Sequence, residues 1–543
     1  MKSKVLAFFL LALTALAGCG GGDGGAYTGG SGALLPALDA TYRASGKAAA
    51  GDVFVHLFEW RWADIARECE QFLGPAGYAA VQISPPSEHA VLARATSGAA
   101  YPWWQRYQPA SYRLDASRSG TLAELREMVA RCRAVGVKIY ADAVINHMTA
   151  GGGAGSAGSA GSAYSKTDYP AVPWSAANFH TGCSVNDYGN AANVQLCELV
   201  GLADLRTEDD AVRQRIADYL IALHAEGVAG FRIDAAKHMQ PRDVDAIVAR
   251  VDAADSAAGR ARPYYFLEVI NNAGEAVTAQ QYFGVGYASG GAADITDFQY
   301  GYRVTDAFLG RNGATLASLQ SLGAASLPSN KAVVFVDNHD NQRAENLYYA
   351  STFSTVPVYE LAVIFMLAYP QGAPSVMSSY GLDRTTAAGR DAGPPSSAGG
   401  VTQSSFDANG NSRCTATLGS AQAGSWICEH RRNAIAQMVA FRRVTAGAPL
   451  VGFQTVDADS NRIAFAREGK GFVALSRSLA AIFVAATTLP DGDYCNVALY
   501  RYTAASGAAR ASCSGPPIGV AAGAALINLP AYGAVVLHIG ARL

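Results

Sequence analysis

The sequence predicts a parallel (β/α)8 barrel, or TIM barrel, with one inserted subdomain and an all-β C-terminal domain. Eight short apolar runs alternate with helical segments between residues 53 and 378, which is typical of parallel strands joined by helices. Polar residues gather where several of these runs end, and barrel enzymes display their chemistry at such strand ends. Beyond residue 446 the pattern changes to short alternating strands and turns, which indicates a separate β domain.

The expected strands are short, and helical segments or turn signals separate them. The first strand covers residues 53–57, and a helical segment from residue 62 follows it and is expected to stop at Gly74-Pro75. Further helices are expected over residues 122–134 and 212–225. The other strands are expected over residues 79–84, 137–144, 230–234, 264–269, 293–298, 332–336 and 375–378.

One long segment breaks this alternation. Residues 147–204 show no strong helical period, and they include a Gly/Ala/Ser run at 151–165 that we interpret as a flexible insertion. We therefore expect a signal peptide (1–18), a linker (19–49), barrel segments (50–146 and 205–445), an inserted subdomain (147–204) and a C-terminal β-sandwich (446–543).

The composition is that of a globular protein. Half of the 543 residues are hydrophobic, and the formal net charge is −2. No basic excess suggests a nucleic-acid partner, and no acidic tail is present. We expect a monomer.

The N-terminus has the features of an export signal. Lys2 and Lys4 precede an apolar run at 5–17, which is too short to span a bilayer and is typical of a secretory signal. The run ends in Leu16-Ala17-Gly18-Cys19, which resembles the lipobox of bacterial lipoproteins, and residues 20–32 would then form a flexible tether. We expect a lipid-anchored protein of the outer membrane or cell surface; an ordinary signal peptide followed by release is the alternative.

Cysteine usage supports export. Setting aside Cys19, eight cysteines remain, an even number that suits an oxidising compartment. Cys414 and Cys428 lie close in sequence, as do Cys495 and Cys513, so local disulfides are plausible. The spacing alone does not fix the connectivity, and the absence of a Cys-x-x-Cys pair argues against a zinc or redox site.

Polar residues close four of the expected strands. Each could be a helix cap or a core hydrogen-bonding group, but a barrel brings all these strand ends to one mouth. Three carboxylates in one pocket suit a reaction that passes through an oxocarbenium-like state. The residues are Asp142, Asn146 and His147 after the third strand, Arg232, Asp234, Lys237 and His238 around the fourth, Glu268 after the fifth, and Asp337, Asn338, His339 and Asp340 after the seventh.

Aromatic residues follow the second strand. Trp103, Trp104 and Tyr107 offer flat apolar faces on which sugar rings could stack. Packing in the core is the alternative for these side chains.

These residues resemble the α-amylase family, family 13 of the glycoside hydrolases, and especially its animal-type members. The resemblance covers roughly residues 50–543. It rests on Asp142-Ala-Val-Ile-Asn-His147, Gly230-Phe-Arg-Ile-Asp-Ala-Ala-Lys-His238, Phe266-Leu-Glu-Val269 and Phe335-Val-Asp-Asn-His-Asp340, and it extends to His56-Leu-Phe-Glu-Trp-Arg-Trp62 and Pro102-Trp-Trp-Gln-Arg-Tyr-Gln-Pro109.

The resemblance implies an endo-acting, retaining α-amylase that cleaves internal α-1,4 bonds of starch, glycogen and maltooligosaccharides. Asp234 would be the nucleophile, Glu268 the general acid/base and Asp340 the transition-state stabiliser. The implied substrate-binding residues are Trp103, Trp104, Tyr107, Gln108, His147, Tyr188, Arg232, Lys237, His238, Ile270 and His339.

The resemblance also implies bound ions and disulfides. Animal-type members bind chloride through two arginines and an asparagine; here Arg232 and Asn338 are present, but Ser375 stands where the second arginine is expected. We therefore expect weak or absent chloride dependence. A structural Ca²⁺ would be held by oxygen atoms of Asn146, Gln195, Asp204 and His238. The implied disulfides are Cys69–Cys132, Cys183–Cys197, Cys414–Cys428 and Cys495–Cys513.

Two alternatives keep the same fold. The enzyme could transfer glycosyl groups instead of hydrolysing, and no single residue excludes this. A catalytically silent, surface starch-binding lipoprotein is the other alternative, and the joint presence of Asp234, Glu268 and Asp340 argues against it.

Overall fold

The structure is a computed structural model that describes residues 48–152, 156–343, 357–415, 423–506 and 509–543. The expected signal peptide, the lipobox cysteine Cys19 and nearly all of the expected linker lie outside these residues. Over the described ranges, no helix is long and apolar enough to cross a membrane.

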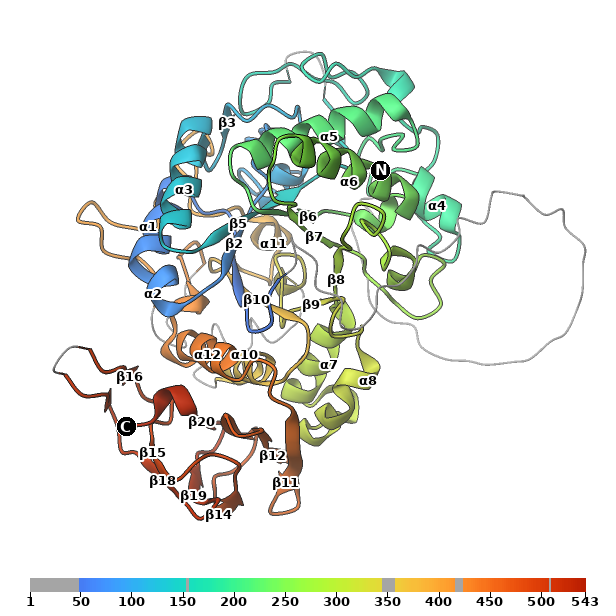
Figure 1. The fold of residues 1–543 in the computed structure, drawn as a ribbon. Helices are drawn as coiled ribbons and strands as arrows, with labels where there is room; N and C mark the ends of the chain where they lie inside the picture. The colour runs from blue at the N-terminus through green and yellow to red at the C-terminus, as the bar shows by residue number, and fades with distance from the viewer. Residues whose placement is uncertain (1–47, 153–155, 344–356, 416–422, 507–508) are drawn as a thin grey trace, which may run out of the picture. The chain divides into compact units, whose positions relative to one another are not determined.

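Eight parallel strands close into a barrel, which confirms the predicted fold class (Figure 1). Their order around the barrel is β1-β10-β9-β8-β7-β6-β5-β2, so the first and last strands of the chain's barrel lie side by side. The strands are β1 (Phe54–Leu57), β2 (Ala80–Ile83), β5 (Lys138–Ala143), β6 (Gly230–Ile233), β7 (Tyr264–Leu267), β8 (Asp294–Thr296), β9 (Ala332–Val334) and β10 (Ala373–Ser378).

Aromatic side chains fill the barrel interior. Phe54, Tyr140 and Phe266 belong to a buried cluster separate from the main core, and the rings of Phe54 and Tyr140 lie 5.6 Å apart. Gly230, the first residue of β6, lies beside this cluster. A Cβ at this position would lie 2.9 Å from the Tyr140 ring and 2.6 Å from the Tyr264 carbonyl oxygen. Close packing of this kind leaves no room for a side chain at the start of β6.

Helices surround the barrel, and one prediction about them is wrong. The first helix does not stop at Gly74-Pro75: α1 (Trp62–Glu68) continues through a π-helical turn into α2 (Gly74–Ala76), and Gly77 then adopts a φ of 87°. Pro75 is tolerated because it lies in the first turn of α2. The other principal helices are α3 (Leu122–Ala134), α5 (Asp210–Ala225), α6 (Pro241–Ala257), α7 (Phe298–Leu309), α8 (Leu322–Ala325), α10 (Val358–Ala368), α11 (Ala387–Asp391) and α12 (Asn433–Val444).

The segment between β5 and α5 has little regular structure, but it is folded. Its elements are the 3₁₀ turn η3 (Ala176–Asn178) and the helix α4 (Ala191–Leu196). The fully buried Glu88 carboxylate accepts hydrogen bonds from the backbone N–H groups of Ala160 and Ser162, at 3.0 and 2.8 Å. The interpretation of this run as a flexible insertion is therefore wrong for its described residues 156–165, which a distant carboxylate holds in place.

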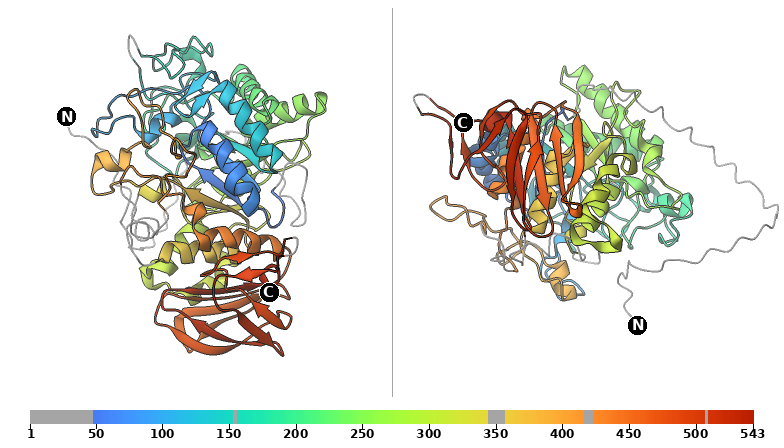
Figure 2. Two further views of the ribbon diagram at one scale, coloured as in Figure 1. Left: turned by 90° about the vertical axis from the view of Figure 1, so that its left-hand side faces the viewer. Right: turned by 90° about the horizontal axis from the view of Figure 1, so that it is seen from below.

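Two antiparallel sheets form the C-terminal region, drawn in orange and red in Figure 2. Alternate residues of both sheets, among them Phe472, Ile527 and Leu537, share one buried core. One sheet consists of β11 (Leu450–Val456), β12 (Asp459–Arg467), β13 (Gly471–Ser476) and β20 (Ala534–His538); the other consists of β14 (Ala481–Ala486), β19 (Ala524–Leu529), β18 (Ile518–Ala521) and β15 (Gly492–Tyr494). Small hairpins pair β3 (Ala116–Ser117) with β4 (Gly120–Thr121) and β16 (Tyr502–Thr503) with β17 (Ser512–Cys513).

Four disulfides cross-link the described chain. They are the pairs that the family resemblance implies: Cys69–Cys132, Cys183–Cys197, Cys414–Cys428 and Cys495–Cys513.

Candidate active site

The candidate catalytic carboxylates lie at the carboxyl ends of barrel strands. Asp142 is the next-to-last residue of β5, Asp234 directly follows β6, and Glu268 directly follows β7. Asp340 lies in the loop after β9. Because β5, β6 and β7 are neighbours in the barrel, the first three carboxylates open onto the same mouth.

Arg232 joins three of these carboxylates. Its Nη1 donates to Asp142 Oδ1 at 2.6 Å and to Asp234 Oδ1 at 2.9 Å, and its Nη2 lies 2.6 Å from Glu268 Oε1. The guanidinium is buried, so these charge-assisted bonds are shielded from water. One planar cation thereby fixes Asp234 and Glu268 side by side.

The turn after β6 fixes Glu268 from the backbone. Ala235 has a φ of 49°, in the left-handed region that a residue with a Cβ rarely adopts. This turn directs the Ala235 N–H to Glu268 Oε2 at 2.8 Å. The residue that follows Asp234 thus also sets the orientation of Glu268.

Burial shifts the acidity of this pair. Burial raises the pKa of Asp234 and of Glu268, and the Arg232 guanidinium partly opposes both shifts. The negative charge of Asp234 further raises the pKa of Glu268. Three carboxylates around one cation favour a state in which one of them keeps a proton.

Asp340 is held differently from the other three carboxylates. Its side chain is 45% exposed and lies 3.4 Å from His339 Nε2. Asn338 Oδ1 accepts hydrogen bonds from the backbone N–H groups of Asp340 and Asn341, at 3.1 and 2.8 Å. The turn is therefore fixed, while the Asp340 carboxylate faces the open side of the mouth.

The aromatic residues of the rim lie on a 3₁₀ turn, η2 (Trp103–Tyr107), that contacts the carboxylates. The Tyr107 hydroxyl donates to Asp142 Oδ2 at 3.0 Å, and its ring stacks on His339 with centroids 4.8 Å apart. Arg343 lies 4.3 Å above the Trp103 ring. Trp103 and Trp104 are only partly buried, so core packing does not account for them fully.

Two predicted binding residues connect this turn to the inserted segment. His147 Nε2 bonds the Tyr107 carbonyl oxygen at 3.0 Å, and Gln108 Oε1 accepts from the Ala150 N–H at 3.0 Å. Burial lowers the pKa of His147 to about 4, so this imidazole is neutral at pH 7.

A second group of predicted residues gathers on the other side of the carboxylates. Lys237 Nζ donates to the Ile270 carbonyl oxygen at 2.7 Å and to Glu275, and it lies 4.8 Å above the Tyr188 ring. The Tyr188 and His238 rings lie 6.2 Å apart. Neither Glu275 nor Arg343 was predicted to belong to the site, because no local sequence pattern marks the contacts that they make.

The residues implied for calcium come together from separate segments. Asn146 Nδ2 lies 3.4 Å from Asp204 Oδ1, His238 Nδ1 bonds the Val194 carbonyl oxygen at 2.8 Å, and Gln195 Nε2 bonds the Met239 carbonyl oxygen at 3.4 Å. Asp204 is buried, and its carboxylate also bonds His180. The Asp204 carboxylate and the side-chain amide of Asn146 carry hard oxygen atoms, the type of donor that Ca²⁺ prefers. In the described ranges, no three His, Cys, Asp or Glu side chains gather in a way that could hold a metal ion.

The residues implied for chloride border a small cavity. Arg232, Asn338 and Ser375 are among the residues that line this space of about 30 Å³, which is large enough for one water molecule or a small ion. Glu268 also lines it.

The chain is similar in sequence and in structure to known α-amylases. Residues 102–298 match the family model for the α-amylase catalytic domain, and residues 454–540 match the α-amylase C-terminal all-β domain. The chain is 43% identical to an α-amylase of Oryzias latipes over 463 residues (82% of this chain, 86% of that protein) and 42% identical to one of Tribolium castaneum over 500 residues (90% and 94%). The crystal structure of wild-type α-amylase I from Eisenia fetida is similar, with a TM-score of 0.77 and 34% identity, over 92% of this chain and all of that one.

Proposed function

Because the chain belongs to the α-amylase family of glycoside hydrolases, we propose that it is an endo-acting, retaining α-amylase. Its substrates would be the internal α-1,4-glucosidic bonds of starch, glycogen and maltooligosaccharides. One observation carries the proposal: the Arg232 guanidinium holds Asp234 and Glu268 together on adjacent strands. Retaining glycosidases need their two carboxyl groups about 5–5.5 Å apart, and a shared guanidinium favours so short a separation.

In the first step, Asp234 attacks the anomeric carbon while Glu268 protonates the glycosidic oxygen. The bond from that carbon to the leaving oxygen breaks, and a bond to an Asp234 carboxylate oxygen forms. Burial and the neighbouring charge of Asp234 raise the pKa of Glu268, which favours the protonated acid. Arg232 donates to Asp234 and so favours its ionised, nucleophilic form.

In the second step, the Glu268 carboxylate accepts a proton from water as that water attacks the anomeric carbon. The bond to Asp234 breaks, and the product has the configuration of the substrate. Asp340 would stabilise the positive charge that develops on the sugar ring in both steps. Its partial exposure leaves it free to contact the sugar.

Binding groups on both sides of the carboxylates support endo action. On one side of the carboxylates, glucose rings would stack against Trp103, Trp104 and Tyr107. On the other side, Lys237 and Tyr188 would contact the glucan. The further residues proposed to contact substrate are Gln108, His147, His238, Ile270 and His339. A glucan that crosses the mouth would therefore be cleaved internally.

Calcium is proposed as a structural ion. Asn146 and Asp204 would contribute side-chain oxygens, and Gln195 and His238 backbone oxygens. When bound, the ion would cross-link the inserted segment to the ends of β5 and β6. A bound chloride, in contrast, would find little positive charge to balance its own, because Arg232 already bonds three carboxylates and Ser375 adds no charge.

Export is proposed on the basis of the disulfides. Four disulfides suit an oxidising compartment. Anchoring through Cys19 and a monomeric state stay predictions.

A time course on soluble starch tests the proposed function. We expect the wild type to release reducing ends with the α configuration, as seen by NMR at early times, and Asp234→Asn to release almost none. Equal release by both proteins, or initial β products, would contradict it. Incubation with maltoheptaose distinguishes transfer from hydrolysis, because transfer yields oligomers longer than seven glucose units.

A further inference from the structure

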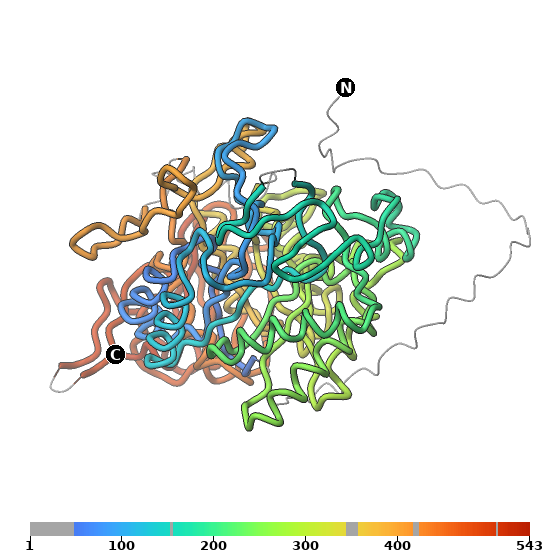
Figure 3. Tube along the Cα trace, turned by 90° about the horizontal axis from the view of Figure 1, so that it is seen from above, coloured from blue at the N-terminus to red at the C-terminus, as the bar shows by residue number. Residues whose placement is uncertain are grey.

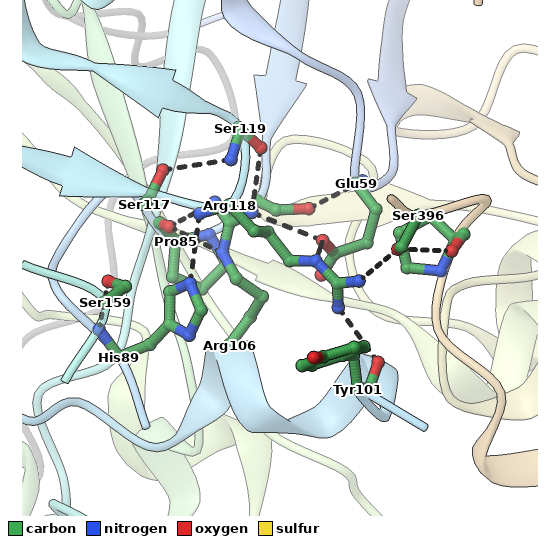
Figure 4. A network of polar contacts seen from close by, with 12 residues as sticks. Glu59, Pro85, His89, Tyr101, Arg106, Ser117, Arg118, Ser119, Ser159 and Ser396 are labelled. Carbon is green, nitrogen blue, oxygen red and sulfur yellow. Dashed lines mark hydrogen bonds and ion pairs between the residues drawn. The ribbon is translucent and has the colours of Figure 1, made fainter. Parts of the chain in front are cut away.

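A buried charge cluster lies behind the aromatic turn η2. We define the Glu59 cluster as Glu59, Arg106 and Arg118, all three of which are buried. Arg106 Nη1 donates to Glu59 Oε2 at 3.2 Å, and Arg118 Nε lies 3.6 Å from the same oxygen. Figure 4 shows both guanidinium groups converging on this carboxylate. The Glu59 carboxylate is therefore the shared anionic partner of two buried guanidinium groups.

The cluster connects the loops of three adjacent strands. Glu59 follows β1, the arginines follow β2, and Arg118 Nη2 donates to Ser396 Oγ, after β10, at 2.7 Å. Arg118 Nη1 also donates to the Tyr101 carbonyl oxygen at 3.2 Å. Figure 3 shows part of the loop after β2, in blue, beside the loop after β10, in orange.

Arg106 belongs to η2 itself. Its Nε donates to the Pro85 carbonyl oxygen at 3.2 Å, and its Nη1 donates to Ser119 Oγ at 2.8 Å. The next residue is Tyr107, which bonds Asp142 and stacks on His339. A displacement of Arg106 would therefore displace the aromatic turn that borders the carboxylates.

Glu59 itself is held rigidly. Its φ is 65°, in the left-handed region, and its N–H donates to Ser84 Oγ at 2.9 Å. A fixed backbone of this kind keeps the carboxylate in one place. Without that charge, two guanidinium groups would lie buried near each other and uncompensated, which is unfavourable.

We propose that Glu59 is a positioning residue that acts through Arg106 and Arg118 to hold the aromatic turn η2 against Asp142 and His339 at the barrel mouth. The inference rests on the proposed function, because it assigns the aromatic turn to substrate binding. Glu59 does not itself contact the substrate in this proposal. Its loss would weaken glucan binding more than it slows the chemical step.

The test compares Glu59→Gln with a matched control, Asp252→Asn. Asp252 is also a buried carboxylate, and Arg262 Nε donates to its Oδ2 at 2.6 Å. Arg262 precedes β7, so this pair belongs to the end of the barrel opposite the mouth. We expect both variants to lower the melting temperature. Only Glu59→Gln is expected to raise KM for maltoheptaose, by about fivefold, with kcat within about twofold of the wild type.

Tryptophan fluorescence gives a readout independent of activity. Trp60, Trp62, Trp174 and Trp426 are at most 3% exposed, whereas Trp103 and Trp104 are partly exposed. Acrylamide quenching therefore reports mainly on the aromatic turn, and we expect Glu59→Gln to raise the quenching constant while Asp252→Asn leaves it unchanged. If Glu59→Gln does not fold, Arg118→Lys replaces it; this variant keeps the charge but cannot bridge Tyr101 and Ser396 together.

The outcomes separate this inference from the proposed function. A wild type that releases no reducing ends from starch would refute the proposed function. An active wild type whose Glu59→Gln or Arg118→Lys variant matches Asp252→Asn in KM and quenching would refute the positioning role. A rise in KM and quenching at Glu59 alone, with Asp252→Asn unchanged, supports it.

Discussion

At the scale of single residues, the arrangement around Arg232 shows how one side chain can organise a mouth built from several strands. The guanidinium bonds Asp142, Asp234 and Glu268 through two nitrogens. A lysine has one charged nitrogen and cannot reproduce this planar arrangement. Arg232 therefore sets the relative positions of Glu268, the proposed acid, and Asp234, the proposed nucleophile.

Arg232→Lys should lower activity although it keeps the charge. We expect kcat on maltoheptaose to fall about 100-fold, because Glu268 and Asp234 would lose their common donor. The melting temperature should fall as well, since buried carboxylates would lose partners. Steady-state kinetics together with calorimetry check this prediction, and a fully active Arg232→Lys variant would contradict it.

The pH dependence should follow the two carboxyl groups that burial perturbs. In the proposed mechanism activity requires protonated Glu268, so kcat/KM should fall as pH rises through the raised pKa of Glu268. It requires ionised Asp234, so kcat/KM should also fall as pH decreases through the pKa of Asp234, which burial raises. A bell-shaped profile is the expected result for the wild type.

Glu268→Gln separates the two limbs of that profile. With a dinitrophenyl maltoside, whose leaving group needs no protonation, this variant should keep measurable activity and lose the decline at high pH. On starch its kcat should fall about 1000-fold. A high-pH decline that persists in the variant would assign that limb to another group.

Chloride dependence can be tested on the wild type alone. Ser375 borders the cavity that Arg232 and Asn338 also line, and it brings no second cation to balance an anion beside Glu268. We expect less than about a twofold change in kcat when chloride is added to a chloride-free assay. Strong activation by chloride would overturn this expectation.

At the scale of elements, the sequence predicted strands better than it predicted contacts. The apolar runs located all eight barrel strands, because parallel strands buried on both faces read as continuous apolar segments. The end of the first helix was predicted too early, since Pro75 can begin a helical turn as well as end one. The run at 151–165 was predicted to be flexible, because the Glu88 carboxylate that bonds Ala160 and Ser162 lies far away in sequence.

For the candidate site too, the sequence predicted positions along the chain better than it predicted contacts. Residues at strand ends, such as Asp234 and Glu268, could be proposed because the barrel brings those ends together. Partners from distant loops could not: Glu275 beside Lys237, Arg343 over Trp103 and Ser396 on Arg118 depend on how the loops fold back. No periodic pattern marks such pairs.

Calcium removal should act on the inserted segment. This segment has few regular elements, and its proposed ligands Gln195 and Asp204 face residues that follow β5 and β6. With EGTA we expect a melting temperature lower by about 5 °C and faster proteolysis within residues 147–204. Restoration by Ca²⁺ but not by Mg²⁺ is the control, and a chelated protein of unchanged stability and protease resistance would contradict the proposed site.

At the scale of the whole molecule, the described chain consists of a barrel, an inserted segment and two C-terminal sheets, with the aromatic turn and the proposed catalytic residues at one barrel mouth. A polymeric substrate must reach that mouth. Export to a surface would suit this need, because starch does not cross membranes unaided. The four disulfides are consistent with such a location.

Lipid attachment at Cys19 is the prediction that decides where the enzyme works. If cleavage precedes Cys19, acylation would anchor the chain, and residues 20–32 would act as a tether with a mean span of about 20 Å. Expressed in a bacterium with lipoprotein processing, the wild type should fractionate with membranes and incorporate labelled palmitate. Cys19→Ala should abolish the label, while its amylase activity per molecule should equal that of the wild type, because Cys19 has no place among the proposed catalytic residues. An unlabelled wild type recovered from the medium would instead indicate an ordinary signal peptide and a freely secreted enzyme.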